Sequence, residues 1–292
     1  MDKDRIAWLG TGLMGSPMAA RLLQAGYPLI AYNRTASKAK SLREAGAQIA
    51  DSAHQALEDA TCVIMMLADA GAIEQVLFKR HARGLLAGRT VIQMGTIGPR
   101  ESLGIQDKVS AAGGDYLEAP VLGSIAPARS GDLIVMVGAS LAQFNRWREL
   151  LACFGPEPHL VGPVGQAAAL KLALNQLIAS LMAAFSLSLG MVQRHDVPVE
   201  TFMQVLKQSP LYANTFAKKL PKLMQRDFAE PNFPLRLLLK DVRLFLHEAG
   251  HLGLDPASLR GTERIIKTAL RKGLGELDYA GIHNVISPGN DS

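Results

Sequence analysis

The chain of 292 residues is 48% hydrophobic and 20% charged, which is ordinary for a soluble globular protein and sufficient for two domains. Its net charge of +5 is too dispersed to favour nucleic-acid binding, and its two cysteines lack the spacing of a metal site or a redox pair. No secretory signal precedes the first apolar run, so we expect a cytoplasmic protein.

Short apolar runs alternate with helical patterns through the first half of the chain. The predicted strands cover residues 6–9, 29–32, 48–50, 62–67, 90–93, 115–118 and 133–137. The predicted helices cover residues 16–25, 37–45, 54–58, 72–77, 99–112 and 141–153. Such alternation predicts an α/β fold with right-handed crossovers and a mostly parallel, doubly wound sheet. It leaves open the polarity of the strands after Glu118.

The pattern changes near Gly162 and Pro163, beyond which the sequence predicts only helices. These cover residues 167–194, 199–208, 213–222, 235–249, 256–272 and 282–286. We therefore predict an α/β domain over 1–163 and an all-helical domain over 164–292, joined by the long helix. That helix contains Lys171, Asn175 and several serines, which favours a buried helix over a membrane span. It is apolar nearly all round, which fits either burial within one subunit or a homodimer.

The turn after the first strand reads Gly10-x-Gly12-x-x-Gly15. Gly10 permits a tight turn, Gly12 lets the backbone approach phosphates, and Gly15 lets the following helix pack on the strand. The N–H groups of this turn, which includes Leu13 and Met14, face an anion together with the helix dipole. The strand before it and the helix after it supply the context of a Rossmann-type dinucleotide site.

The end of the second strand indicates which dinucleotide is bound. NAD-binding folds usually place an acidic residue there for the ribose, but this chain reads Asn33-Arg34-Thr35, with Lys38 shortly after. The Arg34 guanidinium can instead bind a 2′-phosphate, and Thr35 and Lys38 can add donors. These residues predict NADP(H) in preference to NAD(H). The alternative is that Arg34 and Lys38 are ordinary surface cations.

Two further loops follow strong strands and lie at the edge of the sheet where ligands bind. The first contains Leu67 and Ala68, and the second contains Thr96. Thr96 can donate a hydrogen bond to the nicotinamide or to the substrate. It can also simply cap the helix that begins near Pro99.

Lys171 is the most suggestive titratable residue because it lies in an otherwise apolar helical stretch. Burying a lysine cation is costly, so Lys171 either extends outward or has a chemical role. Asn175 lies one helical turn later on the same face. The pair can present a proton donor and an amide to a carbonyl oxygen, and the sequence leaves both alternatives open.

Together these motifs resemble the β-hydroxyacid dehydrogenase family, which includes the 3-hydroxyisobutyrate dehydrogenases. The resembling segments are Leu9 to Met18, Glu118 to Ser124, Lys171-x-x-x-Asn175, Phe233 to Asp241, and Gly275 to Tyr279. They look most like the NADPH-dependent glyoxylate/succinic semialdehyde reductase branch. The resemblance implies a homodimer, hydride transfer between NADPH and a small aldehyde or keto acid, and Lys171 as general acid/base.

The resemblance also implies the roles of other residues. Asn175 would orient Lys171 or the substrate oxygen, and Leu122, Gly123 and Ser124 would form the substrate loop. Lys240 would reach the cofactor. Asp241 would help hold the closed arrangement, and Phe233 would line the substrate cleft.

Two positions depart from the family pattern. Leu122 replaces a serine hydroxyl expected to bond the substrate carboxylate, a loss of about 1.5–3 kcal/mol. Gly95 stands where a serine is usual. These departures put the substrate in question more than the reaction. The alternatives are an imine reductase, which typically lacks the lysine, and a non-catalytic NADP-binding module.

Overall fold

The computed structural model describes residues 3–78 and 83–289, without the side chain of Arg83. The chain divides into two compact units, Met1–Lys171 and Leu172–Ser292. Each unit is described by itself.

A nine-stranded sheet forms the centre of the first unit, in the order β3-β2-β1-β4-β5-β6-β8-β7, with β9 beside β8. The strands are β1 Ile6–Leu9, β2 Leu29–Tyr32, β3 Gln48–Ile49, β4 Cys62–Met65, β5 Thr90–Gln93, β6 Asp115–Glu118, β7 Val121–Leu122, β8 Ile134–Gly138 and β9 His159–Gly162. The strands from β3 to β6 are parallel, and β8 is antiparallel to both β6 and β7. After Glu118, at the end of β6, the strand direction therefore reverses in β8.

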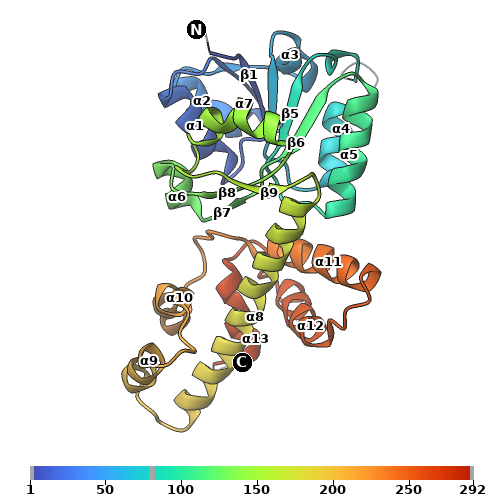
Figure 1. The fold of residues 1–292 in the computed structure, drawn as a ribbon. Helices are drawn as coiled ribbons and strands as arrows, with labels where there is room; N and C mark the ends of the chain where they lie inside the picture. Colours follow the sequence, from blue (N-terminus) through green and yellow to red (C-terminus); the bar gives the residue numbers. More distant parts are fainter. Residues whose placement is uncertain (1–2, 79–82, 290–292) are drawn as a thin grey trace. The chain divides into compact units, whose positions relative to one another are not determined.

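Helices cover both faces of this sheet (Figure 1). They are α1 Gly15–Gln24, η1 Ala36–Ala39, α2 Lys40–Glu44, α3 Ala53–Glu58, α4 Ala70–Leu77, η2 Arg83–Leu85, α5 Pro99–Ala111, α6 Ile125–Ser130 and α7 Leu141–Leu151. Ile6 and Trp8 pack in one hydrophobic cluster with Trp147, while Ala7 and Leu9 pack in another, because successive strand residues point to opposite faces. The expected doubly wound α/β fold is confirmed.

Some short elements differ from the prediction. The helix expected from residue 72 begins at Ala70 because the Asp69 side chain caps it, accepting from the Ala72 N–H at 2.8 Å. Neither the two-residue β7, nor the six-residue α6, nor the largely exposed β9 was predicted. Such elements are too short or too polar to show a hydrophobic period.

The second unit is built from helices. They are α8 Gln166–Arg194, which begins in the first unit, and α9 Val199–Gln208, α10 Asn214–Gln225, α11 Leu235–His251, α12 Ala257–Arg271, η3 Tyr279–Ile282 and α13 His283–Ile286. Met182, Phe185 and Leu189 of α8 belong to its hydrophobic core. A buried ion pair adds to the packing, with 2.7 Å between Lys219 Nζ and Asp278 Oδ1.

By length and composition α8 is apolar enough to cross a membrane, with a mean hydropathy of 1.7 over an 18-residue window that is 39% buried. Core helices meet the same criterion, and α8 contributes to the core of the second unit.

Candidate functional site

The glycine turn between β1 and α1 has the form that its sequence predicts. Gly10 has a φ of +103°, and a side chain there would overlap the Met66 carbonyl. A Cβ on Gly15 would overlap the Gly10 carbonyl, so α1 begins in direct contact with the end of β1. A Cβ on Gly12 would have no atom within 4 Å. The first two glycines therefore allow close packing, whereas Gly12 borders open space.

The open space beside Gly12 fits a pyrophosphate. The N–H groups of Gly12, Leu13 and Met14 donate to no acceptor within the parts of the chain that the structure describes. They lie at the N-terminus of α1, where the helix dipole favours an anion. The Thr11 N–H is already bound, donating to Asn33 Oδ1 at 3.1 Å. The turn can thus hold the phosphates of a dinucleotide.

Asn33 has a structural role at the end of β2. Besides accepting from Thr11, its side chain donates to the Thr35 carbonyl at 2.9 Å and so ties the glycine turn to the segment that follows β2. Arg34, Thr35 and Lys38 are exposed there. The Arg34 and Lys38 side chains have no partner among the described residues and can meet a phosphate.

The loops after β4 and β5 contact each other. A side chain at Gly95 would overlap the Leu67 carbonyl, and a Cβ on Gly10 would lie 3.0 Å from Leu67 Cδ2. The buried Gln93 side chain also donates to the Gly95 carbonyl at 2.9 Å. Leu67 therefore lies against the loop after β5 and against the glycine turn, and the departure at Gly95 has a steric reason in this chain. Ala68 and the partly exposed Thr96 belong to the same two loops.

The segment after β6 leads to the predicted substrate loop. Leu122 ends β7 and pairs with Ile134 of β8, and Gly123 has a φ of +149°. Ser124 precedes α6, but its side chain makes no capping bond. Since β1, β4, β5 and β6 are parallel, their carboxyl ends share one edge of the sheet, as do the loops that follow them.

Lys171 and Asn175 lie one turn apart on α8, and both are buried, with 8% and 3% of their surface exposed. Asn175 Nδ2 donates to Asp241 Oδ2 of α11 at 2.6 Å. Lys240 Nζ lies 2.8 Å from the other oxygen of that carboxylate. In the second unit the structure thus brings Asn175, Lys240 and Asp241 together. Asn175 Oδ1 is buried without a partner among the described residues.

Phe233 lies just before α11, the helix that carries Lys240 and Asp241. Its ring is partly buried against the core of the second unit, 6.1 Å from the Tyr279 ring between centroids. The described contacts thus place Phe233 beside Tyr279.

The three most buried polar residues of the first unit were not predicted as site residues. They are Ser102, Gln93 and Glu118, which are at most 1% exposed. Their sequence signal is weak, because α5, β5 and β6 contain other polar residues from which these three do not stand out.

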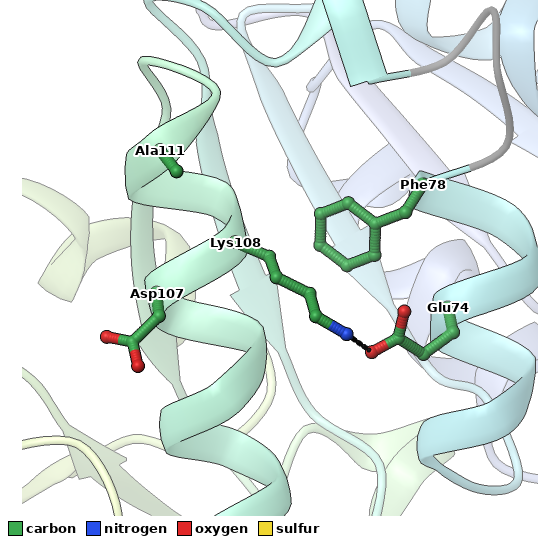
Figure 2. Close-up of a pocket in the computed structure, with 5 residues that line it drawn as sticks. All are labelled: Glu74, Phe78, Asp107, Lys108 and Ala111. Carbon is green, nitrogen blue, oxygen red and sulfur yellow. Dashed lines mark hydrogen bonds and ion pairs between the residues drawn. The ribbon is translucent and has the colours of Figure 1, made fainter.

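A depression between α4 and α5 is lined by Glu74, Phe78, Asp107, Lys108 and Ala111 (Figure 2). Lys108 forms an ion pair with Glu74, and its Nζ lies 5.7 Å from the centre of the Phe78 ring. None of the predicted residues lines it. Within the described ranges, no cluster of three or more histidine, cysteine or acidic residues could hold a metal ion.

Two sequence families match the chain. Residues 5–162 match the NAD binding domain of 6-phosphogluconate dehydrogenase. Residues 165–286 match the family described as NAD-binding of NADP-dependent 3-hydroxyisobutyrate dehydrogenase.

Similar proteins agree with this match along the whole chain. The chain is 29% identical to glyoxylate/succinic semialdehyde reductase 1 of Arabidopsis thaliana, covering 95% of this chain and 96% of that protein. It is 30% identical to 2-hydroxy-3-oxopropionate reductase of Escherichia coli, covering 95% of each. A solved structure of 3-hydroxyisobutyrate dehydrogenase from Mycobacterium tuberculosis has the same fold, with a TM-score of 0.88 at 20% identity over 97% of this chain and 99% of that one.

Proposed function

Because this chain belongs to the β-hydroxyacid dehydrogenase family of nicotinamide-dependent oxidoreductases, we propose that it reduces a small aldehyde or keto acid with NADPH. The product is the corresponding hydroxy acid. The observation that carries the proposal is the buried Lys171–Asn175 pair, in a chain whose glycine turn leaves room for a dinucleotide.

The residues at the end of β2 favour NADPH over NADH. The nicotinamide cofactor supplies the hydride that the carbonyl carbon accepts. Arg34 and Lys38 are exposed cations beyond that strand, and no acidic side chain stands there to repel a 2′-phosphate. A guanidinium binds phosphate through two parallel hydrogen bonds, so Arg34 favours NADPH.

Lys171 is proposed as the general acid. Its ammonium gives a proton to the carbonyl oxygen, which becomes the hydroxyl of the product, and in the reverse direction its amine takes that proton back. Such proton transfer contributes about 10²–10⁴ in rate. Asn175 is held by Asp241 through its amide nitrogen, which leaves its buried Oδ1 to accept from a hydroxyl or an ammonium. Asp241 and Lys240 keep that amide oriented.

The substrate is proposed to carry a carboxylate bound by the backbone of residues 122–124. Leu122 supplies an isobutyl group where a hydroxyl would bond that carboxylate. A carbonyl acid larger and more apolar than glyoxylate, such as a semialdehyde, suits this loop better because its chain can contact the leucine.

We also propose that the protein is a homodimer. Leu177, Leu187 and Met191 of α8 are 47%, 64% and 65% exposed in the isolated chain. A second copy packed on α8 would cover these large apolar side chains.

The test is NADPH oxidation by the purified protein against glyoxylate, succinic semialdehyde, tartronate semialdehyde and one cyclic imine. We expect turnover with a carbonyl acid and a loss of at least about 10²-fold in kcat for Lys171→Ala, with unchanged NADPH binding. Lys218→Ala, at an exposed position on α10, is the matched control and should retain full activity. Reduction of the imine alone would refute the proposal and indicate an imine reductase. Tight NADPH binding without any turnover would indicate a non-catalytic binding module.

The cofactor choice is tested by comparing kcat/KM for NADPH and NADH in the native protein and in Arg34→Ala. We expect the native protein to prefer NADPH. In the variant, the ratio of kcat/KM for NADPH to kcat/KM for NADH should fall about tenfold, because one charged phosphate contact is removed. Arg43→Ala, an exposed arginine on α2, is the control. A native preference for NADH would refute this part of the proposal.

A further inference from the structure

A buried carboxylate joins the end of β6 to the start of α8. Glu118 is 1% exposed. Its Oε1 accepts hydrogen bonds from the N–H groups of Gly165 at 2.8 Å and Ala168 at 3.0 Å. Its Oε2 accepts from the Ser102 hydroxyl, which lies 2.9 Å from the Tyr116 hydroxyl. Both oxygens of Glu118 are thus satisfied inside the first unit.

The sheet is built to admit this carboxylate. Glu118 pairs with Gly138 of β8, and a Cβ on Gly138 would overlap the Glu118 side chain. Any other residue at position 138 would therefore force the Glu118 side chain to move. Glycine at position 138 therefore leaves free the space that the Glu118 side chain occupies.

Two effects act on the pKa of Glu118 in opposite directions. Burial raises the pKa of Glu118, whereas the hydrogen bonds from Ser102 and from the backbone of Ala168, Gly165 and Ala167 lower it. The N–H groups at the start of α8 have no carbonyl of a preceding helical turn to bond, so Glu118 accepts from them at the positive end of the helix dipole. The hydrogen bonds and the dipole of α8 therefore stabilise the Glu118 carboxylate, which would be costly to bury without them.

The position of Glu118 connects two parts of the proposed site. Lys171 follows Ala168 by three residues, about 4.5 Å further along the helix axis. Leu122, in the proposed substrate loop, follows Glu118 by four residues. The Glu118 side chain thus fixes the start of α8, the helix that carries Lys171, against β6, the strand that leads to the substrate loop.

We propose that Glu118 is a positioning residue that sets the placement of Lys171 relative to the substrate loop by anchoring the first turn of α8. The proposal rests on the proposed function of Lys171. Without the anchor, the N–H groups of Gly165 and Ala168 lose their acceptor, and the first turn of α8 can shift along its axis. A displacement of about 1 Å in a reacting group can cost 10²-fold in rate, so the effect falls on kcat more than on cofactor binding.

The experiment compares Glu118→Ala with Glu118→Gln. Alanine removes the acceptor, whereas the glutamine carbonyl can still accept from α8 while its amide donates to Ser102. We expect kcat to fall about 10–100-fold in the alanine variant and to stay within about threefold in the glutamine variant. The dissociation constant for NADPH should change less than about twofold in both. Ser140→Ala, which removes a cap from α7, is the control for a lost helix cap without effect on kcat.

Amide hydrogen exchange supplies a readout independent of turnover. Glu118→Ala should speed exchange at Gly165, Ala167 and Ala168 at least about tenfold relative to the rest of α8, and Glu118→Gln should restore protection. If kcat per folded molecule is unchanged in Glu118→Ala, or the glutamine variant is as impaired as the alanine one, the positioning role is wrong. If Glu118→Ala does not fold, Ser102→Ala, which removes the donor to Oε2 together with the hydrogen bond to Tyr116, should show a smaller kcat loss of the same kind, and an unchanged kcat there would equally refute the role.

The two proposals fail separately. Absence of turnover in the native protein with every carbonyl would refute the proposed function, while faster exchange in Glu118→Ala would still identify the anchor. Turnover that depends on Lys171 but is indifferent to Glu118→Ala would refute only the positioning role.

Discussion

At the scale of single residues, Leu122 stands where the resemblance to the family leads us to expect a serine. Its side chain ends β7 and is only partly buried, so it is available to a ligand at the loop. An isobutyl group cannot accept or donate a hydrogen bond, and a carboxylate facing it must be bound by the backbone alone.

We predict that Leu122→Ser lowers the KM for glyoxylate by about tenfold, since a hydroxyl bonded to a carboxylate stabilises it by about 1.5–3 kcal/mol. The KM for a longer semialdehyde should rise because its apolar contact with the leucine is lost. Steady-state kinetics with both substrates measure the change. An equal effect on both would show that residue 122 does not contact the substrate.

His283 is a buried histidine at the start of α13. It is 1% exposed, and burial, together with the charges of Arg226 and Arg194, lowers its pKa from 6.5 to about 4. The folded state thus favours the neutral ring, while the unfolded chain takes up a proton below pH 6.5. The stability contributed by the neutral ring is complete above pH 6.5 and is lost as the pH falls toward 4.

We expect the free energy of unfolding to fall by about 3 kcal/mol across that interval through this group alone. His283→Gln cannot be protonated and should show a shallower pH dependence in urea unfolding. His195→Gln, at an exposed histidine, should keep the native slope. A native slope in His283→Gln would mean that other groups cause the acid sensitivity.

At the scale of elements, the β1–α1 turn separates packing from binding. Gly15 contacts the Gly10 carbonyl so closely that an added methyl group must move the helix, whereas Gly12 borders open space. Two glycines of one motif therefore have different physical roles.

We predict that Gly15→Ala lowers the melting temperature by several degrees, because overpacking costs about 1–3 kcal/mol. Gly12→Ala should leave the melting temperature of the free protein nearly unchanged and weaken NADPH binding at least about tenfold, because its methyl group occupies the phosphate space. Calorimetry and titration with NADPH measure the two effects. Equal loss of stability in both variants would contradict the separation.

At the scale of the whole molecule, the exposed apolar residues of α8 bear on the number of subunits. In water, several large apolar side chains on one helix favour association. We predict that Leu187→Glu shifts the protein from dimer to monomer in light scattering, because a charge cannot be buried at an apolar interface without a partner. Leu211→Glu is the matched control, since Leu211 is 75% exposed before α10. A native monomer, or a dimer unaffected by Leu187→Glu, would refute this interface.

Features that depend on neighbours along the chain could be predicted from the amino-acid sequence alone. The glycine turn, the alternation of strands and helices, the change to helices after Pro163, and the shared face of Lys171 and Asn175 all follow from spacing and local conformation. The parallel sheet follows too, because right-handed crossovers leave few alternatives.

Contacts between groups far apart along the chain became known from the folded structure. Asn175 meets Asp241, 66 residues away, and Glu118 meets the start of α8, 47 residues away. Gly138 makes room for Glu118 through a strand pairing that carries no local signal. Buried polar groups are satisfied by whichever partner the packing brings near, and that choice depends on the arrangement of whole elements rather than on any short stretch of sequence.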